Sequence, residues 1–129
     1  MGLEERRKIK ELQDVVLPER VQEVEEICGA PIPYDVDWDS FADDLEGLNF
    51  MDNLSCHRLN MALRTICTDD LGKEAVRDAV KVIRLKNVPK DEMRLALADG
   101  ALEMHCAYAL RTEGMWSDNE IHTELLQHL

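Results

Sequence analysis

Hydrophobic residues recur at helical spacing through the first 28 residues of the chain. They form two sets, the first being Ile9, Leu12 and Val16, and the second Leu17, Val21, Val24 and Cys28. Pro18 lies among them, and because proline lacks an N–H and crowds the preceding turn, we expect it either to kink one helix or to open a second. Gly29, followed by Pro31 and Pro33, predicts the end of this helical region.

The pattern changes to a period of two in "IPYDVDW", residues 32–38. Its four apolar side chains point to one side of an extended chain, and its two acids, Asp35 and Asp37, point to the other. This alternation predicts a strand with one buried face and one face in solvent.

Two helices are predicted after this strand. Apolar residues at positions 56, 59, 63 and 66 predict a helix from about Asp52 to Cys67, after an interruption at Gly47 and Asn49. The acids of "TDD" predict the cap of a short helix over residues 71–80, with Leu71 on its apolar side.

The remaining strands are predicted between residues 81 and 106. Apolar and basic residues alternate in 81–88, and Asp99 and Gly100 separate two more alternating runs. Asp-Gly in this position is a strong signal for a two-residue type I′ hairpin, which fixes the register of both strands. The expected cross-strand pairs are Leu97 with Leu102, Leu95 with Met104, Met93 with Cys106, Ala96 with Glu103 and Arg94 with His105.

A terminal helix is predicted from the capping box of Ser117 and Glu120. The order of elements is then α–β–α–α–β–β–β–α. Strands joined by short turns predict an antiparallel meander of three strands, which the strand at 32–38 joins at an edge or beside the strand at 81–88. We predict a single α+β domain over residues 1–129, with a small antiparallel sheet and helices packed on one face.

The size, composition and net charge of the chain indicate which classes of partner to expect. The chain has 129 residues, 45% of them hydrophobic, which suits one domain with a core of its own. Its formal net charge is −12, and phosphates and anionic lipids repel an acidic surface, so neither nucleic acid nor membrane is an expected partner. The first residues are charged and no apolar run approaches the roughly 18 residues of a membrane span, so we expect a cytoplasmic protein.

The segment "DVDWDSFADDLE", residues 35–46, has the acid spacing of a calcium-binding loop. The candidate ligands for calcium or magnesium are Asp35, Asp37, Asp39, Asp43 and Glu46. Against this, Ser40 stands where the loop needs glycine for a sharp turn, and Ala42 where a β-branched apolar residue is usual. The preceding "GAPIPY" also cannot form the helix that such a loop requires.

The favoured interpretation of these acids is structural. Asp35 and Asp37 lie on the outer face of the predicted strand, and Arg84 and Lys86 lie on the outer face of the strand at 81–88. If the two strands are neighbours, the acids and bases form ion pairs across the sheet.

The cysteines do not predict a cofactor or a disulfide. Cys56 and Cys67 lie on one predicted helix at a separation of roughly 16 Å, too far to be bridged. Cys56 with His57, and Cys106 with His105, offer zinc ligands, but neighbours on a helix or strand point apart. We therefore expect reduced, mostly buried thiols at Cys28, Cys56, Cys67 and Cys106.

One polar helix face is a candidate interaction surface, because Met and Arg are enriched at interfaces. Its residues are His57, Arg58, Asn60, Met61 and Arg64. Since catalytic motifs are absent, the leading hypothesis is a non-enzymatic protein, such as an adaptor, chaperone-like or regulatory protein, that contacts a protein partner or forms a homodimer. The second is a divalent-metal protein using residues 35–46, and the third is a thiol enzyme using Cys56 or Cys106.

Overall fold

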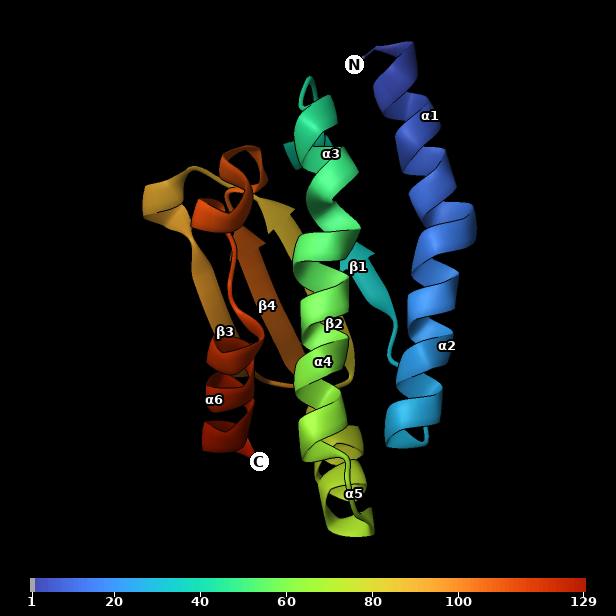
Figure 1. Ribbon diagram of the computed structural model, residues 1–129, viewed down its shortest axis with the longest axis vertical. Coiled ribbons are helices and arrows are strands. Elements are labelled where there is room, and N and C mark those ends of the chain that lie inside the picture. The colour runs from blue at the N-terminus through green and yellow to red at the C-terminus, as the bar shows by residue number, and fades with distance from the viewer. Residues whose placement is uncertain (1) are drawn as a thin grey trace.

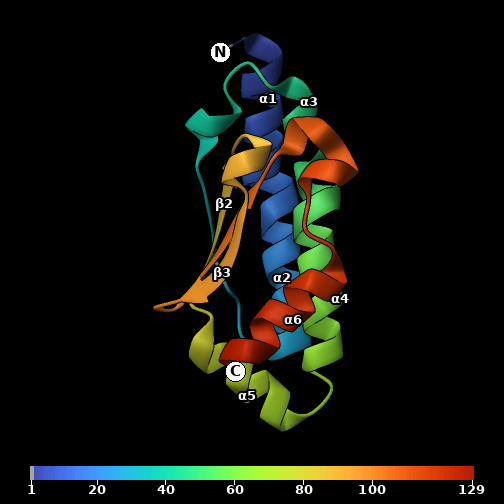
Figure 2. The ribbon, with the colours of Figure 1, turned by 90° about the vertical axis from the view of Figure 1, so that its left-hand side faces the viewer.

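The helices and the strands form two layers. Figure 1 shows the computed structural model of the protein, which describes residues 2–129. Helices lie side by side in front of a four-stranded sheet. Seen from the side in Figure 2, the strands occupy one side and the long helices the other. Within the described residues, one face of the sheet is therefore covered by helices, as predicted, and the opposite face carries no long helix.

The first rod is one continuous helix that passes Pro18. It consists of α1 (Leu3–Glu11), a π-helical turn (Leu12–Val16) and α2 (Leu17–Cys28). In the widened turn the backbone N–H of Leu17 donates to the carbonyl of Leu12, five residues back. A turn of this kind directly before Pro18 accommodates a residue that has no N–H to donate. The rod ends as predicted at Gly29, whose φ of 87° is a left-handed conformation that suits glycine.

The central rod begins earlier than the sequence predicts. Its parts are α3 (Leu45–Met51), a π-helical turn (Asp52–Cys56) and α4 (His57–Ile66). The predicted interruption at Gly47 and Asn49 is wrong, because both residues lie inside α3. The Asp44 carboxylate caps this helix by accepting from the Gly47 N–H at 2.9 Å, and a Cβ at position 47 would collide with that carboxylate. Burial of Leu48 also offsets the low helix propensity of glycine.

The sheet is mixed rather than antiparallel, so the predicted three-strand meander is wrong. Its strands are β1 (Tyr34–Val36), β2 (Val82–Asn87), β3 (Arg94–Ala98) and β4 (Ala101–Cys106). Their order is β1-β2-β4-β3, in which β2 runs parallel to both β1 and β4, and only β3 is antiparallel. The α+β class and the position of the first strand beside the strand at 81–88 are confirmed.

The link between β2 and β3 explains the mixed order. Residues 88–93 include a 3₁₀ turn, Lys90–Glu92, and are long enough to pass over the position that β4 fills. β4 presents Leu102 and Met104 fully buried, whereas β3 is exposed at both of its ends. The more apolar strand of the hairpin therefore takes the central position, and the other one becomes an edge.

The hairpin itself is confirmed. Asp99 has a φ of 53° and Gly100 a φ of 81°, as a type I′ turn requires at both positions. Four of the five expected cross-strand pairs are present, from Ala96 with Glu103 to Arg94 with His105. The pairing of Met93 with Cys106 is absent, because β3 begins at Arg94 and Cys106 lies opposite Asn87 of β2.

Two short helices complete the layer. They are α5 (Asp70–Ala79) and α6 (Asp118–His128). The capping box of Ser117 and Glu120 is confirmed at the start of α6. Leu71, however, is 78% exposed, and Val76 is the buried residue of α5. The predicted apolar face of that helix is therefore wrong at Leu71.

We expect Gly100→Ala to lower the free energy of unfolding by about 1 kcal/mol, since an L side chain is disfavoured at a φ of 81°. Asp99→Asn is the matched control, because Asn tolerates the left-handed region and should change stability by only a few tenths of a kcal/mol. The measurement is the urea midpoint of each variant. Equal midpoints for Gly100→Ala and the wild type would contradict the assigned turn.

Candidate functional site

An apolar groove of about 560 Å³ lies between α2 and β1. The helix contributes Leu17, Pro18 and Val21, and the strand side contributes Tyr34, Val36 and Trp38. These strand residues all point to the same side, as the alternation in the sequence predicted. Pocket walls of aromatic and aliphatic side chains are typical of sites that bind an apolar group.

β1 forms one edge of the sheet, and its backbone determines what that edge can bind. The carbonyl of Pro33 accepts from the Ile83 N–H at 3.0 Å, and the Asp37 N–H donates to the Leu85 carbonyl at 2.9 Å. Because backbone groups alternate along a parallel ladder, those of Tyr34 and Val36 point away from β2. Within residues 2–129 they bond to no other segment. The groove therefore runs beside an unpaired strand edge.

The Tyr34 side chain lies partly in the groove and partly in the core. Its ring lines the groove, while its hydroxyl is buried and has no hydrogen-bond partner among the described residues. Burial raises the pKa of Tyr34 well above its ordinary value, and the neighbouring Cys56 thiol acts in the same direction. Tyr34 therefore offers the groove an aromatic surface and no acid or base.

The uncovered face of the sheet carries charges. Around a hollow of about 390 Å³ lie Asp35, Asp37, Arg84, Lys86, Glu103 and His105. Arg84 pairs with Asp35 at 3.5 Å and with Glu103 at 3.5 Å, which confirms the predicted contact between Asp35 and Arg84. Asp37 forms no ion pair with Lys86, because its carboxylate accepts from the Ser40 N–H at 3.2 Å and caps the following 3₁₀ turn.

A charged network fixes the helical wall of the groove to the central rod. Arg20 on α2 donates from Nε and Nη2 to the two carboxylate oxygens of Asp52, at 2.7 and 2.9 Å. Glu23 accepts from Arg20 at 3.0 Å and from the amide of buried Asn60 at 2.8 Å. Burial alone would raise the pKa of Glu23, but the hydrogen bonds from Asn60 and Arg20 outweigh it and lower that pKa.

Some side chains of the predicted interaction surface on α4 make contacts within the fold, and others are partly exposed. Asn60 is buried, Arg64 lies 3.8 Å from Glu23, and Arg58 donates to the Trp116 carbonyl at 3.3 Å. His57 is half-buried and Met61 is 40% exposed. Three of the five side chains thus make contacts within the fold, and partner binding by this face stays a prediction.

The acids of the predicted metal site do not converge on one point. Asp35 pairs with Arg84, Asp37 caps a turn, and Glu46 accepts from Arg111. Asp39 is exposed, and Asp43 adopts a φ of 60°. Residues 2–129 contain no group of three or more His, Cys, Asp or Glu side chains placed to hold a metal ion. The divalent-metal hypothesis therefore has no converged set of ligands in this part of the chain.

The candidate thiol nucleophiles are buried. Burial raises the pKa of Cys56 to about 12 and that of Cys106 to about 12, so both are protonated at neutral pH. A protonated thiol is a poor nucleophile, and neither sulfur reaches solvent. The thiol-enzyme hypothesis gains no support from this arrangement.

Sequence reasoning missed the groove because its two walls lie apart in the chain. The nearest signal was the alternation around Val36 together with the apolar helix face that includes Val21. No protein-family model, curated protein or solved structure matches the chain. No helix within residues 2–129 is long and apolar enough to cross a membrane.

We expect Glu23→Gln to remove a pH-dependent part of stability. A lowered carboxyl pKa stabilises the fold above the ordinary value of 4.5, and this contribution is lost as the pH falls through the folded-state pKa. The Glu23 side chain is 36% exposed, so we expect less than about 1 kcal/mol. Urea unfolding at pH 7 and pH 3 should show a difference from the wild type that shrinks in acid. Glu26→Gln, on the exposed side of α2, is the control; an equal change there would contradict the assignment.

Millimolar calcium chloride should leave the melting temperature unchanged, because three of the five acids are engaged with different partners and no metal-binding group converges within residues 2–129. A ligand that binds the folded state raises its stability by an amount that grows with ligand concentration over Kd. A rise with calcium that disappears in Asp37→Asn would instead support the metal hypothesis.

Proposed function

We propose that this chain is a non-enzymatic binding protein that takes an extended segment of a partner protein into the groove between α2 and β1. The observation that carries the proposal is an apolar groove running along an unpaired strand edge. An extended peptide can join such an edge as an added strand, with its backbone bonded to Tyr34 and Val36. Regulatory and adaptor proteins use contacts of this kind.

The alternation of an added strand determines which side chains the groove receives. Every second residue of the peptide points toward the helical layer, where Val21 and Trp38 offer apolar contacts. The groove of about 560 Å³ has room for more than one such side chain. The segment bound should therefore carry apolar residues at alternate positions.

The remaining side chains of the peptide fall on the uncovered face of the sheet, beside the acids of β1. On the inner side of β1, Asp35 already lies opposite Arg84 of β2. Basic residues on the outer side would meet Asp35 and Asp37 in the same way. The chain's net charge of −12 also steers cationic segments toward it. Charge complementarity thus favours a partner segment in which apolar and basic residues alternate.

A non-enzymatic role is supported by the placement of the reactive groups. Cys56 and Cys106 are buried and protonated, and the hydroxyls of Tyr34 and Tyr108 are sealed in the core with raised pKa values caused first by burial. The groove exposes aromatic and aliphatic surface without an acid–base pair. Such a lining suits recognition better than bond-breaking chemistry.

An eight-residue peptide of alternating Lys and Val is the probe for this proposal. We expect it to bind with micromolar affinity and to change the fluorescence of Trp38. Val21→Glu should weaken binding tenfold or more, because a charge against apolar side chains costs roughly 1.4 kcal/mol or more. Val15→Glu is the matched control, since Val15 lies on the same rod, is 51% exposed and does not line the groove.

Charge reversal tests the second part of the proposal. The alternating Glu and Val peptide should not bind the wild type, and Asp35→Lys should shift preference from the basic peptide toward the acidic one. Equal binding of the basic peptide to the wild type and Val21→Glu would reject the groove. A concentration-dependent dimer that Val21→Glu abolishes, with no peptide binding, would show a second copy of the chain as the occupant instead.

A further inference from the structure

The C-terminal ends of α2 and α4 bring two cysteines together. Both rods run in the same direction and end at the same pole of the molecule (Figure 1). Cys28 is the last residue of α2, and Cys67 follows the last residue of α4. The two are 39 positions apart in the sequence, so no motif spacing links them.

The two sulfurs are close enough to form a disulfide after a small movement. Cys28 Sγ and Cys67 Sγ are 2.9 Å apart, well inside the sum of two sulfur van der Waals radii. Both thiols are free and buried, Cys28 fully and Cys67 with 6% of its surface exposed. Formation of a bond of about 2.05 Å therefore requires a shift of less than an ångström between the sulfurs.

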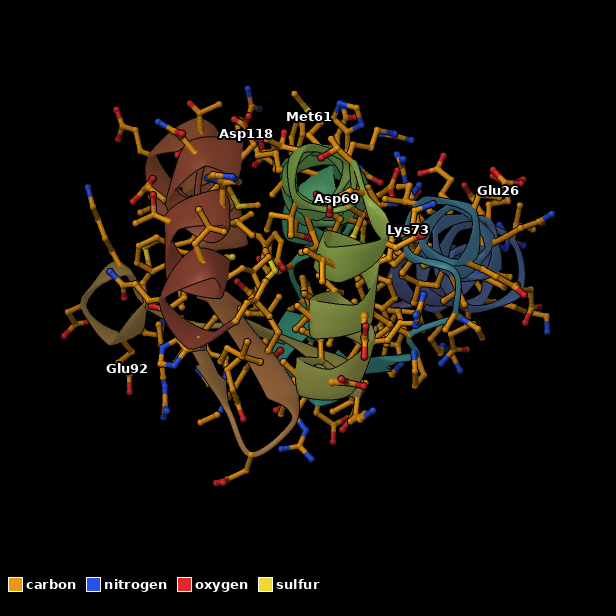
Figure 3. The ribbon with its side chains drawn as sticks, turned by 90° about the horizontal axis from the view of Figure 1, so that it is seen from below. Glu26, Met61, Asp69, Lys73, Glu92 and Asp118 are labelled. Carbon is orange, nitrogen blue, oxygen red and sulfur yellow. The ribbon has the colours of Figure 1, made fainter. Side chains whose placement is uncertain are left out.

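Two basic residues of α5, Lys73 and Arg77, lie near the pair. Arg77 Nη1 donates to the Cys28 carbonyl at 3.0 Å, beyond the last turn of α2. Figure 3, seen from this pole, shows α5 crossing below α4, with Lys73 labelled between α5 and α2. Burial raises the pKa of both thiols, whereas the charges of Lys73 and Arg77 oppose that effect and favour thiolate formation when the site opens.

We propose that Cys28 and Cys67 are a redox pair that forms an intramolecular disulfide with a small-molecule disulfide as the oxidant. Cys67, the less buried of the two, loses its proton, and its sulfur attacks the oxidant, which breaks the S–S bond of the oxidant and releases one thiolate. Cys28 then loses its proton and attacks Cys67 Sγ in the mixed disulfide, expelling the second thiolate. In total the protein loses two protons and two electrons, and the oxidant takes them up to become two thiols.

The bond would clamp the helical layer at one end. It closes a loop across 39 positions and fixes the end of α2 to the end of α4, so it stabilises the fold by restricting the unfolded chain. Cys28 is as buried as Cys56 and Cys106, and what sets it apart is the contact of its sulfur with Cys67 Sγ at 2.9 Å. This inference does not depend on the groove, because the cysteines lie at the far end of α2.

The test uses the full chain, folded, with oxidised glutathione at pH 8. After denaturation and thiol counting, we expect two thiols where the reduced protein has four, and no retained glutathione. Peptide mapping should join the segments that contain Cys28 and Cys67. The melting temperature should rise by about 10 °C and return to its starting value with dithiothreitol.

Variants separate this pair from other thiol chemistry. Cys67→Ala should remove the rise in melting temperature and leave three thiols after oxidation, whereas Cys106→Ala should keep the rise and leave one. A second variant, Cys28→Ala, repeats the test if Cys67→Ala is poorly folded. Four thiols in the oxidised wild type, or a map that joins any other two cysteines, would overturn the proposal.

Discussion

Burial of the α3–α4 rod against the centre of the sheet is the constraint on which the other elements depend. Leu48, Met51, Leu59 and Leu63 along this rod are all buried, and each such side chain contributes about 1.5–3 kcal/mol of hydrophobic stabilisation. The rod lies between α2 and α6, with β2 and β4 behind it (Figure 1). Its position therefore determines where both flanking helices pack.

The groove follows from this arrangement. Asp52 in the π-helical turn of the central rod receives Arg20 of α2 through two hydrogen bonds, which sets the distance of α2 from the rod. α2 then overhangs β1, the edge strand on that side, and the space between them is lined by side chains that neither element buries completely. The proposed peptide site is thus a consequence of how a two-layer fold ends at its edge.

The placement of reactive and charged side chains also supports a binding role for the groove. The described cysteines and both tyrosine hydroxyls are held inside, while the charges of the uncovered sheet face are paired only in part. Lys86 and Asp37 keep surface in solvent on that face. This distribution supports the proposed binding role, and the proposed disulfide between Cys28 and Cys67 would stiffen the helical layer.

The sequence by itself determined what depends on neighbouring residues. The type I′ hairpin at Asp99, the capping box at Ser117, the alternation around Val36 and the end of the first rod at Gly29 follow from local backbone preferences and side-chain periodicity. These signals are complete within a few residues, so they are readable without the rest of the fold.

Only the tertiary structure decided the features that combine distant segments. The helix through Gly47 forms because burial against the core outweighs local propensity, and the parallel pairing of β2 with β4 depends on which strand of the hairpin is the more apolar. Cys28 and Cys67 are in contact because α2 and α4 end at the same pole of the molecule. The groove beside Val21 exists because α2 overhangs β1. Free energy from contacts between distant residues fixes these positions, and no local pattern encodes it.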